Sequence, residues 1–139
     1  MTKWKGVAAL VAACAVALGA CSSSSSGTPK ALSLSGEKVP VSQVTSAYSQ
    51  MCAVAKQAQT NAAGTVGQFA NAESGLNVLA TVLNKDHPQQ SQRLLSALTT
   101  YTADVGHSPP PAASATDANN LLATAKQGLD ALGITAPAC

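Results

Sequence analysis

The sequence is poor in aromatic and in charged residues, which make up 3% and 10% of its 139 positions. Stacking platforms for nucleic-acid bases need several exposed rings, and only Tyr48, Phe69 and Tyr101 follow Trp4. Phosphate backbones attract clustered basic residues, whereas the charges here are scattered along the chain. We therefore expect no nucleic acid as a partner, and a core built from Leu, Val and Ala.

Motifs of the common catalytic and metal sites are also missing. The chain has no G-x-S-x-G, no H-E-x-x-H, no C-x-x-C, no EF-hand loop and no glycine-rich phosphate loop. Its carboxylates are few and widely spread, so an acid pair of the glycosidase type is not indicated.

The remaining candidates are the two histidines and one Met–Cys pair. Asp104 and His107 can meet at a helix end, but no nucleophile pattern adjoins them, and a solvated His107 at the start of a loop is favoured. His87 is expected to be an exposed residue at a helix start. Met51 and Cys52 could contribute to a soft-metal site, but Met51 fits a core position better. We expect no catalytic residue, no cofactor and no metal ion, and hence no enzyme.

The N-terminal segment has three zones. Lys3 and Lys5 precede an uncharged apolar run, residues 6–20, that is too short to span a membrane. A positive head followed by such a run is typical of a signal peptide; a buried N-terminal helix is the alternative. The run ends in Leu18-Gly19-Ala20-Cys21, which resembles the lipobox of bacterial lipoproteins.

That resemblance implies that a diacylglyceryl group is attached to the Cys21 sulfur and that the chain is cut before this residue. The protein would then sit on the extracytoplasmic face of the cell membrane, held by its acyl chains. Residues 21–40, which include the serine run 22–26, are expected to form a tether and an extended arm. The division is therefore a signal peptide (1–20), this tether (21–40) and a helical domain (41–139).

Processing changes the cysteine count from four to two. Cys14 would leave with the signal peptide and Cys21 would carry lipid, so Cys52 and Cys139 remain in a compartment where disulfides persist. We predict that they pair, which would stabilise the fold by about 4.5 kcal/mol on the chain-entropy model. Reactive thiols or metal ligands are the alternative, which the missing C-x-x-C disfavours.

Beyond the arm, apolar residues recur at helical spacing in four stretches. The four stripes are Val44, Tyr48, Met51, Ala55, Ala58 and Ala62; Val66, Phe69, Ala72, Leu76, Leu79 and Leu83; Leu94, Leu98, Tyr101 and Val105, with Leu95 alongside; and Leu121, Leu122, Ala125, Leu129 and Leu132. Four such stripes with short connections predict an all-α fold, a small antiparallel bundle of about four helices.

Helix ends have their own signals. Ser42 and Asp86 are expected as N-caps, with Pro88 early in the third helix, and Thr116 or Asp117 is expected to cap the last one. Gly133 suits a left-handed residue at a helix C-terminus. Ahead of the first helix, residues 31–42 can form a short β-hairpin or simply an extended arm.

The layout of lipobox, helical stripes and the tail Pro137-Ala138-Cys139 is similar to that of small helical lipoproteins of actinobacteria. It implies no activity. The first hypothesis is an accessory or interaction protein of the cell envelope that docks to an envelope protein or wall component through polar helix faces. The alternative is a binding module for an apolar small molecule or lipid in a cavity between helices, against which close packing by alanine argues.

Overall fold

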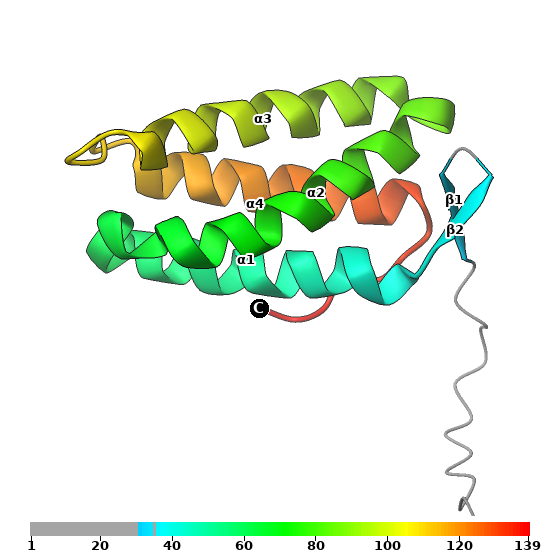
Figure 1. Cartoon of the computed structure of the whole chain (residues 1–139), viewed down its shortest axis with the longest axis horizontal. Helices are drawn as coiled ribbons and strands as arrows, with labels where there is room; N and C mark the ends of the chain where they lie inside the picture. The colour runs from blue at the N-terminus through cyan, green and yellow to red at the C-terminus, as the bar shows by residue number, and fades with distance from the viewer. Residues whose placement is uncertain (1–30, 35) are drawn as a thin grey trace, which may run out of the picture.

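A computed structural model describes residues 31–34 and 36–139. In this part of the chain a two-stranded hairpin precedes four α-helices, which confirms the predicted all-α bundle (Figure 1). The elements are β1 (Leu32–Leu34), β2 (Glu37–Val39), α1 (Val41–Asn61), the 3₁₀ turn η1 (Ala62–Thr65), α2 (Val66–Asp86), α3 (Pro88–Gly106) and α4 (Ser114–Ala131).

Successive helices run in opposite directions, and each one packs on the next. α4 also packs against α1, so the four helices enclose one core. The hairpin lies at one end of the bundle, close to the turn between α2 and α3 (Figure 1). η1 and the loop between α3 and α4 lie at the opposite end, which we call the loop end.

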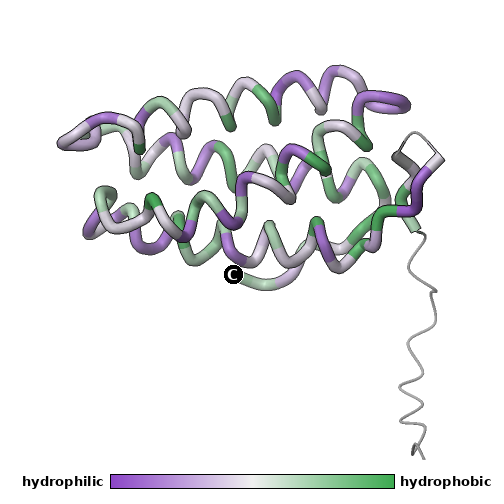
Figure 2. Tube along the Cα trace, in the orientation of Figure 1, coloured by the Kyte–Doolittle hydropathy of each residue, from purple (hydrophilic) through white to green (hydrophobic). Residues whose placement is uncertain are grey.

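The apolar stripes predicted from the sequence form this core. Most of their members are buried, and the largest fully buried side chains include Tyr101, Phe69 and Met51. Figure 2 shows apolar positions recurring along every helix, with a strongly hydrophilic segment between α2 and α3. Two of the residues given with the stripes are exposed. Val66 is 47% exposed, because it is the first residue of α2 and lies at the loop end, and Leu95, beside the stripe of α3, is 42% exposed.

Alanine and glycine allow the helices to approach closely. Ala47, Ala55 and Ala58 of α1 are all buried. A Cβ added to Gly75 of α2 would collide with the Ala47 side chain, and one added to Gly128 of α4 would lie 2.8 Å from Leu83 Cδ1. These contacts indicate close packing between α1 and α2 and between α2 and α4, as the alanine-rich stripes predicted.

Of the two forms considered for residues 31–42, the structure has the hairpin. β1 and β2 pair antiparallel, with Leu32 opposite Val39, and Gly36 takes the positive φ of 90° that the turn requires. Leu32 and Val39 are both buried in the core, and β1 contacts α2. This part of the expected arm therefore belongs to the packed domain.

The helix starts differ from the predicted ones. α1 begins at Val41 after Pro40, and the Ser42 side chain does not cap it. Asp86 is the last residue of α2, and His87 occupies the N-cap of α3, because the α2 ladder continues until the His87 N–H bonds to Leu83 O. Pro88 is at the first position of α3, as predicted.

α4 begins at Ser114 with Ala113 at the N-cap, three residues before Thr116 and four before Asp117, the expected caps. The Ser114 N–H and hydroxyl both donate to Pro111 O, at 3.1 and 2.8 Å, so the helix starts from this turn and Asp117 falls within its first turn. At the other end Gly133 has φ 70°, and the Ile134 N–H bonds to Leu129 O, which confirms the predicted left-handed helix end.

Candidate functional site

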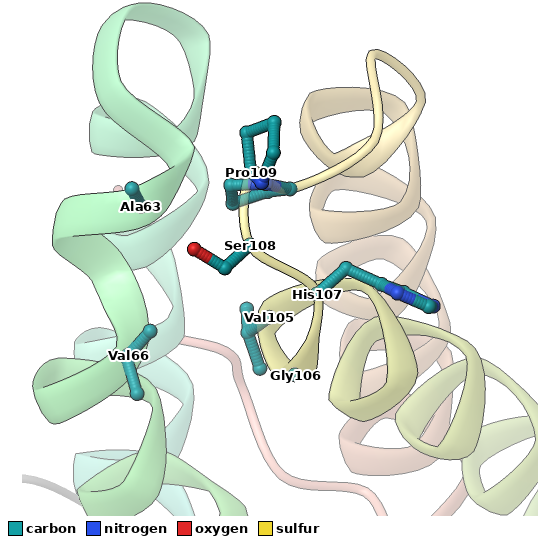
Figure 3. Close-up of a pocket in the computed structure, with 8 residues that line it drawn as sticks. Ala63, Val66, Val105, Gly106, His107, Ser108 and Pro109 are labelled. Carbon is teal, nitrogen blue, oxygen red and sulfur yellow. The ribbon is translucent and has the colours of Figure 1, made fainter.

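A surface hollow lies at the loop end, between the α1–α2 turn and the loop that follows α3. Its volume is about 460 Å³. We call it the loop-end hollow and define it by Ala63, Val66, Val105, Gly106, His107, Ser108, Pro109 and Pro110 (Figure 3). Most of these side chains are apolar, and the exposed Val66 contributes to one wall. The hollow can accept a small apolar group, although it is open to solvent.

The polar groups of this hollow do not form a catalytic pair. The Ser108 hydroxyl points toward Ala63, whereas the His107 ring points away from Ala63 and Val66 (Figure 3). His107 is exposed, and its backbone N–H donates to Asp104 O at 3.1 Å. The predicted solvated state of His107 is confirmed; its side chain does not meet Asp104 in a hydrogen bond.

Beneath the loop, two carboxyl groups meet where α3 ends and α4 begins; we call this the α3–α4 corner. Asp104 is only 8% exposed, and its Oδ2 is buried without a hydrogen-bond partner. It faces Asp117 closely enough for a hydrogen bond. Burial raises the pKa of Asp104, and the Asp117 carboxyl raises it further, whereas the Ser114 hydroxyl and the His107 charge lower this pKa.

A second surface feature is a polar groove between α3 and α4. It has a volume of about 350 Å³ and is lined by Arg93, Ser96, Ala97, Thr100, Asp117, Asn120 and Thr124. We call it the polar groove. A guanidinium, a carboxyl, an amide and three hydroxyls give it both donors and acceptors of hydrogen bonds. Methyl and methylene groups also make up a large part of its surface, so the groove can combine hydrogen bonds to peptide groups or hydroxyl-rich polymers with apolar contacts.

The two cysteines predicted to pair are joined. The Cys52–Cys139 disulfide connects the middle of α1 to the tail that follows α4, with the two Cα atoms 5.3 Å apart. Cys52 is 4% exposed, so its end of the bond is buried. One turn to either side on α1, Lys56 Nζ donates to Cys139 O at 2.8 Å, and the Tyr48 hydroxyl lies 3.7 Å from Cys139 Sγ.

The remaining candidates have structural positions. Met51 is fully buried in the core, as predicted. His87 is half-buried at the N-cap of α3. Within residues 31–34 and 36–139, no group of three or more His, Cys, Asp or Glu side chains is arranged to hold a metal ion. Cys21 and the lipobox lie outside the described residues.

Sequence reasoning missed the buried polar groups. Thr65 and Tyr101 share a buried hydrogen bond of 2.9 Å, and Ser91 donates to Ala80 O at 2.7 Å. Asp104 was considered only together with His107. Asp104 follows Tyr101 by three residues, which places it near the buried stripe of α3. This spacing was the sequence signal that could have indicated its burial.

Comparisons of the chain with protein-family models, with curated proteins and with solved structures give no match. No helix within the described part of the chain combines the length and apolarity needed to cross a membrane.

Proposed function

We propose that the protein is a cell-surface lipoprotein, cut before Cys21 and anchored to the extracytoplasmic face of the membrane by lipid on that cysteine. Its bundle serves as an accessory or interaction protein of the cell envelope and has no catalytic activity. The lipobox Leu18-Gly19-Ala20-Cys21 supports the anchor. The placement of the hairpin and of the α3–α4 loop at opposite ends of the bundle supports the role in interaction.

The observation that carries this role is the arrangement of the two ends. Residue 31 enters the domain at the hairpin end, whereas the loop between α3 and α4 lies at the other end (Figure 1). α3 has 19 residues, which corresponds to a rise of about 28 Å. An anchor attached before the hairpin would therefore leave the loop end and the outer helix faces free to meet a partner.

The polar groove is the docking surface that we favour. Four exposed residues line it: Arg93, Ser96 and Thr100 of α3 and Asn120 of α4. They present hydrogen-bonding groups from both helices. The partner is an envelope protein or a wall component, because both offer peptide or hydroxyl groups that such a lining can bind. This refines the expectation that polar helix faces form the interface.

The anchor is tested by substituting the lipidated residue. The Cys21→Ser chain should move from the detergent phase to the aqueous phase after expression in a bacterium that processes lipoproteins. Cys14→Ser is the matched control and should stay in the detergent phase, because Cys14 lies in the cleaved segment. Mass spectrometry of the processed N-terminus should find diacylglycerol on Cys21. An unmodified Cys21 in membrane fractions would refute the proposal.

The docking surface is tested by site-specific crosslinking in intact cells. A photoreactive residue at Asn120, in the polar groove, should give a crosslinked product of defined mass. The same residue at Asn71, which is also exposed but lies on α2, is the matched control and should give none. Equal products at both positions, or none at either, would count against the groove as the interface.

A binding module for an apolar small molecule or lipid is the second candidate, and the loop-end hollow favours it. Its volume of about 460 Å³ falls within the range of about 300–1,000 Å³ that is usual for small-molecule sites. A native mass spectrum of the intact protein should then show added mass that leaves on denaturation. Val66→Asp should abolish this added mass, whereas Ala70→Asp, at an exposed alanine of the same helix that does not line the hollow, should not.

A further inference from the structure

The α3–α4 corner contains a buried carboxyl that lacks a cationic partner. Asp104 Oδ2 is buried and accepts no hydrogen bond. Among the described residues the ion pair of Lys126 with Asp130 is the one salt bridge, so no cation lies within 4.0 Å of Asp104 or Asp117. A buried carboxylate without a counter-charge is strongly unfavourable.

The groups around Asp104 do not replace such a counter-charge. Asp117 of α4 would bring a second negative charge when ionised, and Tyr101 of α3 is a buried neutral hydroxyl already bonded to Thr65. The Ser114 hydroxyl lies close enough to lower the pKa of Asp104, but it carries no charge, and its single hydrogen is donated to Pro111 O at 2.8 Å. His107, from the loop, is exposed to solvent, which screens its charge.

We propose that Asp104 and Asp117 share a proton and so act as an acid-strengthened latch that holds the α3–α4 corner and the loop 107–113 in place. With one proton between them, the contact of two acceptors becomes a hydrogen bond between a carboxylic acid and a carboxylate. Without that proton, two negative charges face each other beneath the loop. The latch is therefore closed in acid and weakened as the pH rises.

The position of the pair indicates that the loop is the segment most affected when the shared proton is lost. Asp104 lies in the last turn of α3, and its carbonyl receives the His107 N–H. Asp117 lies in the first turn of α4. The seven residues between the helices carry one wall of the loop-end hollow, from His107 to Pro110. Repulsion between the carboxylates should thus loosen this wall first, while the core below it stays packed. The inference concerns the fold alone and does not rest on the proposed function.

Hydrogen–deuterium exchange of the full-length protein tests the latch. Protection factors for peptides covering 106–116, corrected for intrinsic exchange, should fall as the pH rises from about 3.5, below the unfolded pKa of about 3.9, to about 7.5. The fall should be roughly tenfold for each unit by which the pKa of Asp104 is raised. Peptides from the middle of α2 should show no such change. Equal protection of the loop peptides at both pH values would overturn the proposal.

Two variants and one control separate the latch from a general effect of pH. In Asp104→Asn and in Asp117→Asn an amide donor replaces the shared proton, so the loop should be as protected at about pH 7.5 as at about pH 3.5, below the unfolded pKa of about 3.9. Two variants guard against a folding defect in either one. Asp86→Asn, at an exposed position at the end of α2, should keep the wild-type response.

The same experiment excludes a metal ion as the occupant. Addition of CaCl₂ or MgCl₂ at pH 7.5 should leave the protection of the loop unchanged if a proton joins the carboxyls. Full recovery of protection with either salt in the wild type, and its absence in both Asn variants, would mean that a divalent cation occupies the corner, and would overturn the proposal. Wild-type pH dependence retained in both Asn variants would overturn it as well.

Discussion

Loss of the Cys52–Cys139 disulfide should destabilise the bundle more than loss of any other single feature of the tail. The bond closes a loop with a sequence separation of 87 residues. On the chain-entropy model, a loop of that length corresponds to about 4.5 kcal/mol. This is a large part of the 5–15 kcal/mol that is usual for the unfolding free energy of small domains.

The expected shift in melting temperature follows from the size of the domain. A domain of about 100 residues loses roughly 4 °C for each kcal/mol, so reduction should lower Tm by about 20 °C. The assay is thermal unfolding followed by circular dichroism at 222 nm, with and without a phosphine reductant, on the wild type and on Cys139→Ser. The serine variant should melt at the temperature of the reduced wild type and should not respond to the reductant.

Lys56→Met is the matched control, because it removes the hydrogen bond to Cys139 O but leaves the disulfide intact. A hydrogen bond at this exposed position is worth at most about 1 kcal/mol, which corresponds to a few degrees. The reasoning would be refuted if reduction changed Tm by less than about 5 °C, or if Lys56→Met changed it as much as reduction does.

Three further predictions concern the core and the corner. Thr65→Val leaves the buried Tyr101 hydroxyl without its partner and should lower the free energy of unfolding by about 1–3 kcal/mol in urea denaturation; an unchanged midpoint would contradict this. Gly75→Ala should destabilise by about 1–3 kcal/mol because α1 leaves no room for a Cβ, whereas Gly67→Ala meets nothing within 4 Å and should stabilise by up to about 1 kcal/mol; equal effects would argue against the close approach. The raised pKa of Asp104 means that the folded state binds the proton more tightly, so its contribution to stability is complete below the unfolded pKa of about 3.9 and is lost as the pH rises through the folded pKa; Asp104→Asn should remove this slope from a series of urea titrations, and an unaltered slope would assign it to other groups.

The helices could be predicted because each has a strong apolar period. Leu76, Leu79 and Leu83 recur at helical spacing and all are fully buried. The helix starts were harder to predict. A capping residue is a local signal, whereas the residue at which a helix starts also depends on the helix or turn that precedes it. Asp86 has the right chemistry for an N-cap, but α2 continues through it, and Ser114 begins α4 from a turn set by Pro111.

The disulfide could be predicted from the expected compartment and cysteine count, since only Cys52 and Cys139 would remain if the chain were cut before Cys21 and that residue carried lipid. The α3–α4 corner could not. Asp104 looks like a polar surface residue unless the positions of α3 and α4 are known, because its neighbours Ser114 and Asp117 follow it across a loop. The loop-end hollow likewise depends on how the α1–α2 turn meets this loop, and sequence spacing carries no information about that meeting.

The crosslink between α1 and the tail also determines how the domain responds to force. If tension acts between residue 31 and Cys139, the force path runs through the hairpin and the first half of α1 and then crosses the disulfide. Only about 20 residues can then be drawn out, roughly 70 Å of extended chain, instead of the roughly 380 Å that the whole domain would yield without the crosslink. α2, α3 and α4 lie outside this path, so the surfaces they form are shielded from tension applied along the chain.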